Sequence, residues 1–262
     1  MIWIDLNLFA GVPGWAIACV VVAHFIGFFI RGAFGFGSNM PIVLLTAWLL
    51  GPHHAILLVV LTASAAQAHL FPQGVKTADW RVTRPLLVGL LAGTAAGTWL
   101  FTQLPADWLT LILGLLISAV VLMDRFRVLD WLAASVDLRS LPVTTTLSVT
   151  SGVVGTVSGG GGIYFLVSYL KRACPAPDLL RGTNLVLSGL FMMGRLVFVT
   201  AAGLFTLDLL VEAALILPAV FLGTWTGTRF FRSATPQRFY AALQTLLLVA
   251  AAALMARGLY RI

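Results

Sequence analysis

Long apolar segments alternate with short polar connections along the whole chain. A first series of apolar runs is followed by a polar stretch at 124–142 and then by a second series of similar lengths. A helix that crosses a bilayer needs about 20 apolar residues, and the runs at 39–50 and 163–171 are too short for this. The runs lie at about 14–30, 39–50, 55–70, 85–103, 108–123, 143–158, 163–171, 182–202, 209–229 and 239–256.

Each of the two short runs follows a glycine-rich segment, RGAFGFGSN at 31–39 and SGGGG at 158–162. Consecutive glycines are unfavourable in a helix interior, at about 1 kcal/mol each relative to alanine, so we expect the helices to break there. Each break would open onto the N-terminus of a new helix, whose free N–H groups and dipole attract anions. Broken helices at matching places in two halves of a membrane protein are typical of a transporter's substrate site.

The two series of runs resemble copies of each other. Gly32, Gly35 and Gly37 align with Gly155, Ser158 and Gly160 at a single offset. The segment RPLLVGLLAGTAAG (84–97) likewise resembles LPAVFLGTWTGTRF (217–230) in its proline and glycine pattern. The chain is therefore predicted to be a single transmembrane domain over 1–262. It would hold a first repeat at about 14–123, a cytoplasmic linker at 124–142 and a second repeat at about 143–256.

Composition and charge support a membrane protein and orient it. Hydrophobic residues make up 60% of the chain and charged residues 10%, against about 25% charged residues in soluble domains. If the first two runs of each half form a pair that enters and returns to one side, the basic connections all share the cytoplasmic side, as the positive-inside rule requires. These connections are 71–84, 124–142, 171–181 and 229–238. The net charge of +7 is thereby explained without nucleic acid.

This topology makes the two repeats inverted. The predicted fold is an all-α polytopic membrane protein with two inverted repeats, each a broken or re-entrant helix pair followed by three transmembrane helices. Whether 39–50 and 163–171 are re-entrant or fully spanning is left open by the charges, because both give the same sidedness. Both termini are predicted to be non-cytoplasmic, in a multi-pass protein of the cell membrane, the inner membrane if the source is bacterial.

Two arginines inside apolar runs are the strongest candidates for function. Arg31 lies directly before the first break, and Arg195 lies within LFMMGRLVFV. Neither has an acidic residue within ten positions, and a buried arginine without a carboxylate requires an anion or carbonyl groups. The alternative for Arg31 is that it marks the cytoplasmic end of the first helix and snorkels to the interface.

Polar and glycine residues near the breaks complete a predicted pocket for an anion. Asn39 and Asn184 are favoured because an amide in lipid needs hydrogen-bond partners. Glycines 89, 93, 97, 223 and 227 are instead assigned to helix packing, because small residues at this spacing let helices approach closely. The predicted substrate-binding residues are Arg31, Gly35, Gly37, Ser38, Asn39, Ser158, Gly159, Gly160, Gly161, Gly162, Asn184 and Arg195. No cofactor or metal site is predicted.

Among the acidic residues, Glu212 is the one that lies inside a predicted span. No acidic pair lies at mid-membrane, so the sequence favours an anionic over a cationic substrate. Glu212, His24 and His69 could carry a coupling proton, but each is explained more simply as a hydrogen-bonded or interfacial side chain. His53 and His54 are expected to be solvated in a short loop.

Three segments, GAFGFGSNMP (32–41), SGVVGTVSGGGG (151–162) and GTNLVLSGLF (182–191), resemble the TauE/SafE family of sulfite and organosulfonate exporters. The resemblance to the duplicated family pattern covers nearly the whole chain. The chain departs from that pattern at Ser38-Asn39, where a Gly-Gly pair is frequent, and the second repeat lacks a proline equivalent to Pro41. The resemblance implies transport of a small sulfur-containing anion, and the departures could signal a different substrate within the family.

The leading hypothesis is a secondary transporter, not an enzyme. Its substrate would be sulfite, thiosulfate or an organosulfonate, bound between the two breaks and moved by alternating access, with a proton or sodium ion as the coupling ion that could drive it. A passive anion channel is the alternative. An intramembrane enzyme using Ser158 is a weaker alternative, because a serine nucleophile needs a base and every histidine precedes residue 70.

Overall fold

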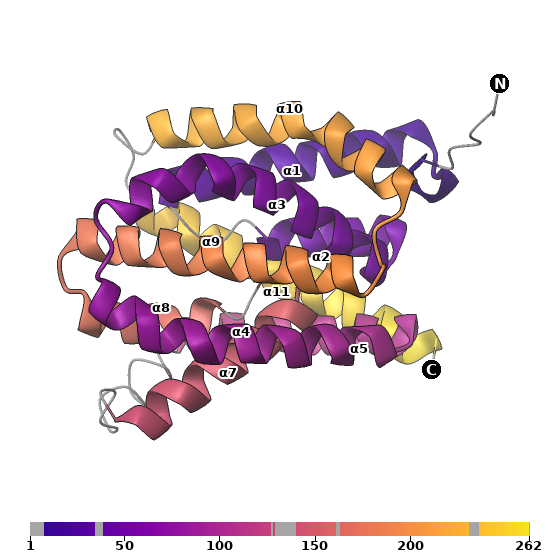
Figure 1. The fold of residues 1–262 in the computed structure, drawn as a ribbon. Coiled ribbons are helices and arrows are strands. Elements are labelled where there is room, and N and C mark those ends of the chain that lie inside the picture. The colour runs from indigo at the N-terminus through magenta and orange to yellow at the C-terminus, as the bar shows by residue number, and fades with distance from the viewer. Residues whose placement is uncertain are drawn as a thin grey trace.

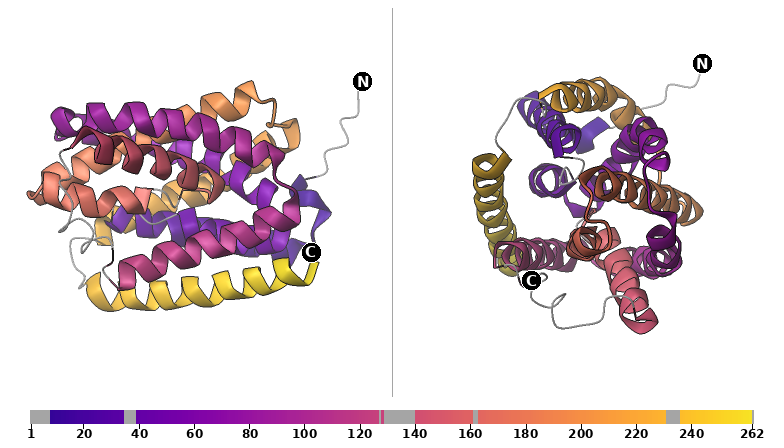
Figure 2. Two further views of the ribbon diagram at one scale, coloured as in Figure 1. Left: turned by 90° about the horizontal axis from the view of Figure 1, so that it is seen from below. Right: turned by 90° about the vertical axis from the view of Figure 1, so that its left-hand side faces the viewer.

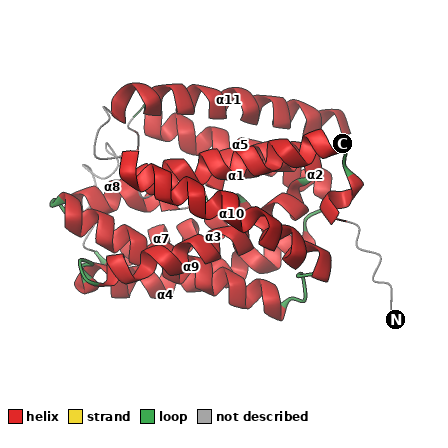
Figure 3. Ribbon diagram, turned by 90° about the horizontal axis from the view of Figure 1, so that it is seen from above, coloured by secondary structure: helices red, strands yellow, loops and turns green. Residues whose placement is uncertain are grey.

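The computed structural model describes residues 8–34, 39–126, 128, 140–160, 163–230 and 236–261. These residues form helices and short connecting loops, with no strand in the described ranges (Figures 1 and 3). The helices are η1 (Leu8–Gly11), α1 (Gly14–Phe34), α2 (Asn39–Leu50), α3 (Pro52–Val75), α4 (Trp80–Gln103), α5 (Ala106–Arg125), α7 (Leu141–Val157), α8 (Ile163–Ala173), α9 (Pro177–Ala201), α10 (Leu207–Phe230) and α11 (Pro236–Arg261).

Within the described residues, six helices are long and apolar enough to cross a membrane: α1, α3, α4, α5, α9 and α10. Large apolar side chains such as Trp99, which is 67% exposed, face outward from the bundle, as expected where lipid replaces water. The helix α2 has 12 residues and α8 has 11. At 1.5 Å per residue each is about 18 Å long or less, which is well short of a bilayer core of about 30 Å.

The first described helix, η1, and the C-terminal end of α11 lie at one end of the bundle, which we call the terminal end (Figure 1). At this end the Arg257 guanidinium of α11 donates to the Trp48 carbonyl of α2, and the Phe9 amide of η1 donates to Glu212 near the start of α10. At the opposite end, which we call the basic end, the Asp79 amide donates to Thr183 Oγ1 over 2.9 Å. This bond joins the α3–α4 connection to the second turn of α9.

The basic end carries the side chains of Lys76, Arg81, Lys171, Arg172 and Arg181. The connections that hold them therefore share one end of the bundle, as the sequence predicts. That this end is cytoplasmic stays a prediction from the positive-inside rule.

Helix pairs from opposite halves of the chain pack closely along glycine seams. The helices α1 and α10 run parallel, because a Cβ at Gly32 would meet the Thr224 carbonyl and one at Gly223 would meet the Phe25 carbonyl. The helices α4 and α7 are also parallel, since glycines 89, 93 and 97 of α4 lie in that order against 148, 149 and 153–156 of α7. The view along the helix axes in Figure 2 shows this bundle from one end.

The packing role predicted for glycines 89, 93, 97 and 223 is confirmed by these contacts. Glycine 227, assigned to the same role, is buried in α10. Close packing holds these helices together, because there is no hydrophobic driving force between helices in lipid.

Substituting Gly93 tests the α4–α7 seam. A Cβ there would lie 2.1 Å from the Val149 carbonyl oxygen, so Gly93→Ala must push the two backbones apart. We expect a loss of about 1–3 kcal/mol, the usual range for overpacking, seen as a lower unfolding temperature in detergent. The control is Gly14→Ala, where the Cβ would meet nothing within 4 Å. An equal effect of the two substitutions would contradict the seam.

Candidate anion-binding site

The two glycine breaks predicted from opposite halves of the sequence meet in space. A Cβ built on Gly160 would lie 2.4 Å from Asn39 Nδ2, and one on Gly159 would lie 2.5 Å from the Val43 side chain. The second break is therefore packed directly on the first turns of α2. Only residues without a side chain fit this contact.

The end of α7 depends on the same glycines. Gly159 has φ +73° and Gly160 has φ +127°, conformations that glycine adopts at little cost. Just before them, the Ser158 amide and hydroxyl both donate to the Val154 carbonyl, over 2.8 Å and 2.6 Å. Ser158 is fully buried, and its hydroxyl hydrogen is used within its own helix, as is common for serine in helices.

Arg31 links residues on the two sides of the first break. Its side chain is 5% exposed; Nη1 donates to Asn39 Oδ1 over 3.3 Å and Nη2 donates to Gln67 Oε1. Gln67 Nε2 in turn donates to the Leu185 carbonyl of α9 over 2.6 Å. Arg31 therefore does not snorkel to the interface but links α1, α2 and α3 inside the bundle.

Arg195 on α9 lies beside the second break. Its side chain is 1% exposed, and Nη2 donates to the Thr156 carbonyl in the last turn of α7 over 3.1 Å. The guanidinium lies 5.6 Å from the centroid of the Phe191 ring. Within the described part of the chain, Nε and Nη1 have no hydrogen-bond partner and no carboxylate pairs with this cation. A buried charge with unused donors is strongly unfavourable unless an anion reaches it.

The remaining predicted residues divide into two groups. Asn184 is buried on α9 next to Leu185, the residue whose carbonyl accepts from Gln67. The others, Gly35, Gly37, Ser38, Gly161 and Gly162, lie outside the described residues. The structure thus brings Arg31, Asn39 and Gly160 to one junction, and Arg195 contacts Thr156, four residues before Gly160.

Residues 19–254 of the chain match the family described as "Sulfite exporter TauE/SafE". The chain belongs to this family. The resemblance read from the glycine motifs is thereby confirmed, and the chain is a multi-pass membrane protein of a transporter family. No curated protein and no solved structure matches the chain.

Sequence reasoning missed one residue of this TauE/SafE junction, Gln67. Its amide bridges Arg31 and α9, yet it carries no charge and lies in an apolar run. Gln67 could have been predicted by the criterion applied to Asn39 and Asn184, because a buried amide must find hydrogen-bond partners.

The expectation for His53 and His54 was wrong. Both lie in the first turn of α3, where His53 packs on Phe101 with ring centroids 4.9 Å apart. His54 Nε2 donates to Glu212 Oε2 over 2.5 Å, and the second carboxylate oxygen of Glu212 accepts the Phe9 amide over 2.5 Å. The fully buried Glu212 therefore ties η1 and α3 to α10 at the terminal end.

His24 and His69, the other two candidates for carrying a coupling proton, differ in burial. His24 is fully buried, and its Nδ1 donates to the Val20 carbonyl over 2.8 Å. His69 is exposed near the basic end of α3. The three titratable side chains thus lie at separate places in the bundle.

Removing His54 should destabilise the terminal end, because it leaves the Glu212 carboxylate buried without a donor side chain. We expect His54→Ala to lose about 3 kcal/mol, the lower end of the range for breaking a buried pair, because His54 is partly exposed. His54→Gln, which keeps a donor, should lose less. Thermal unfolding in detergent measures both, with His69→Ala on the same helix as the control. Equal unfolding temperatures for all three variants would count against the pair.

Proposed function

We propose that this TauE/SafE protein is a secondary transporter that moves a small sulfur-containing anion by alternating access, with the anion bound between the two breaks. The observation that carries the proposal is Arg195, a buried cation whose Nε and Nη1 have no partner in the described residues. Its Nη2 contacts the Thr156 carbonyl, four residues before Gly160, which supports a role for these donors at the junction.

The chemistry of the junction suits a sulfur oxyanion. Sulfite, thiosulfate and sulfonates present two or more oxygens on one face, and the planar guanidinium of Arg195 can bind such a face through two parallel N–H bonds. Glycine backbone can approach a ligand closely, and the N-terminus of α2 at Asn39 adds N–H groups and a favourable dipole. Arg195, a buried cation without an acidic partner in the described residues, disfavours a cationic substrate.

The helix arrangement supports two inverted repeats. If α1–α5 correspond to α7–α11, the first helix of each half packs parallel to the fourth helix of the other half, namely α1 with α10 and α7 with α4. The equivalent helices α1 and α7 start at opposite ends of the bundle. The central contact joins α3 and α9, the third helices of the two halves. Such halves can rock against each other around a fixed midplane site.

Counterflow into proteoliposomes tests transport. We expect labelled sulfite, thiosulfate or sulfoacetate to show saturable counterflow, and Arg195→Gln to reduce it by about 10- to 100-fold, because hydrogen bonds to a charged group contribute about 1.5–3 kcal/mol. Arg125→Gln, at an exposed position in the last turn of α5, is the matched control. Imposed pH and sodium gradients identify the coupling ion.

Two results would overturn parts of this proposal. Flux that rises linearly with anion concentration, without counterflow, indicates a passive channel. Saturable counterflow that is unchanged in Arg195→Gln indicates transport through a site elsewhere in the bundle.

A further inference from the structure

A separate cavity opens near the basic end of the bundle. It has a volume of about 400 Å³ and lies between α1, α3, α9 and α10. Its size falls within the range of ligand pockets, about 300–1,000 Å³, and exceeds what a small sulfur oxyanion needs. Among the described residues that were predicted from the breaks, none lines it.

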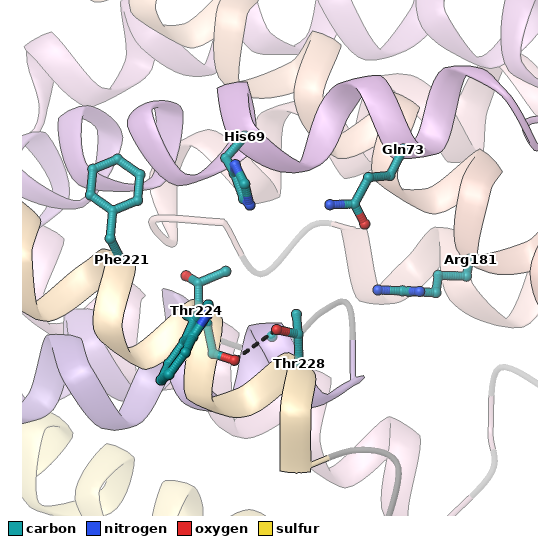
Figure 4. A pocket seen from close by; sticks show the side chains of 8 residues that line it. His69, Gln73, Arg181, Phe221, Thr224 and Thr228 are labelled. Atoms are coloured by element: carbon teal, nitrogen blue, oxygen red, sulfur yellow. Dashed lines mark hydrogen bonds between the residues drawn. The ribbon is translucent and has the colours of Figure 1, made fainter.

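One wall of the cavity carries hydrogen-bond donors. Figure 4 shows His69 and Gln73 of α3 and Arg181 of α9 directed toward the same space. Within the described part of the chain, the side chains of His69, Gln73 and Arg181 form no hydrogen bond or ion pair. The lining contains the positive charge of Arg181 and no carboxylate.

The threonine hydroxyls of the opposite wall, on α10, do not compete as donors. The Thr224 hydroxyl donates to the Val220 carbonyl and the Thr228 hydroxyl donates to the Trp225 carbonyl, each over 2.8 Å. Their hydrogens are therefore already used within the helix, and the side chains of α3 and α9 provide the only charged donor and two further donors for a ligand among the described lining residues. A cavity with one guanidinium, further N–H groups and no acid favours an anion.

The cavity adjoins the first break. Gly32, which lines it, directly follows Arg31 in α1, and His69 lies two residues beyond Gln67, the partner of Arg31. The cavity therefore borders α1, α3 and α9, the helices joined by the hydrogen bonds from Arg31 to Gln67 and from Gln67 to the Leu185 carbonyl.

We propose that this cavity is an entrance site that binds the oxygens of the transported sulfur anion at the basic end, with Arg181 as the charged ligand and His69 and Gln73 as further donors. The inference rests on the proposed transport of such an anion. The same oxyanion chemistry is present in the phosphate of an anionic lipid, and Trp225, which lines the cavity, is 52% exposed on the outside of the bundle. The experiment therefore has to separate the two sources.

Protection of Arg181 from phenylglyoxal tests the site without a transport assay. Protein in phosphatidylcholine nanodiscs is labelled with and without thiosulfate or sulfoacetate, with chloride at equal ionic strength as the salt control. Peptide mass spectrometry then gives the rate at Arg181 and at Arg84, an exposed arginine near the same end. We expect the anion to slow labelling of Arg181 at least fivefold and to leave Arg84 unchanged.

The same labelling in Arg195→Gln, and in Arg195→Lys as a second variant, distinguishes the cavity from the junction. Persistent protection supports a separate entrance site. Protection that disappears in both variants means that binding at the junction alone closes the cavity, which overturns the proposal.

Three further results also overturn the entrance site. The first is no protection of Arg181 in wild type, and the second is equal protection of Arg84. The third is protection by the lipid alone: Arg181 is protected in phosphatidylglycerol nanodiscs without added anion, but never by thiosulfate or sulfoacetate in phosphatidylcholine. A wild-type protein that transports no sulfur anion would instead overturn the proposed function, while the labelling would still report whether the cavity binds one.

Discussion

Non-helical backbone inside a bilayer has to be shielded from lipid, because lipid offers no hydrogen-bond partners to free N–H and C=O groups. In this protein the shielding comes from the opposite half of the chain. The end of α7 packs on the start of α2 through Gly159 and Gly160, and α1 and α7 are held by long glycine seams against α10 and α4. The end of α7 is therefore packed against α2 of the first half, and each half of the chain depends on the other.

Charged side chains inside the bilayer also need partners, and the two buried arginines find them in different ways. Arg31 is engaged by the amides of Asn39 and Gln67, so it fixes the geometry around the first break. Arg195 is engaged through Nη2 by one carbonyl at the end of α7, where a cation also complements the helix dipole. The dipole accounts for the position of Arg195 but not for its unused Nε and Nη1. In the proposed transporter, Arg31 would mainly position the first break and Arg195 would bind the anion.

Local sequence patterns were sufficient for much of the fold. Run length predicted the spans, glycine spacing predicted the packing seams, and the charge of the connections predicted that Lys76 and Arg181 share one end of the bundle. The two arginines were found because a charge in an apolar run is conspicuous.

Residues whose partners are far away in the sequence were harder to predict. Gln67 reaches Leu185 across 118 positions, and His54 reaches Glu212 across 158. No periodicity in a single chain records such pairs. The cavity at the basic end has the same origin, because Arg181 and His69 come from helices in different halves. His53 and His54 were also expected in a short solvated loop, although helix α3 already begins at Pro52.

The central claim is that a sulfur oxyanion binds at the junction of the two breaks through Arg195. The most direct measurement is the unfolding temperature of purified wild type, Arg195→Gln and Arg125→Gln in detergent with sulfite, thiosulfate, sulfate, sulfoacetate, taurine, phosphate or chloride. A ligand at a hundred times its Kd stabilises by about 2.7 kcal/mol. The account predicts stabilisation of wild type and Arg125→Gln by at least one sulfur oxyanion, and its loss in Arg195→Gln. Stabilisation that persists in Arg195→Gln, or its absence for every anion at saturating concentration, would contradict the claim.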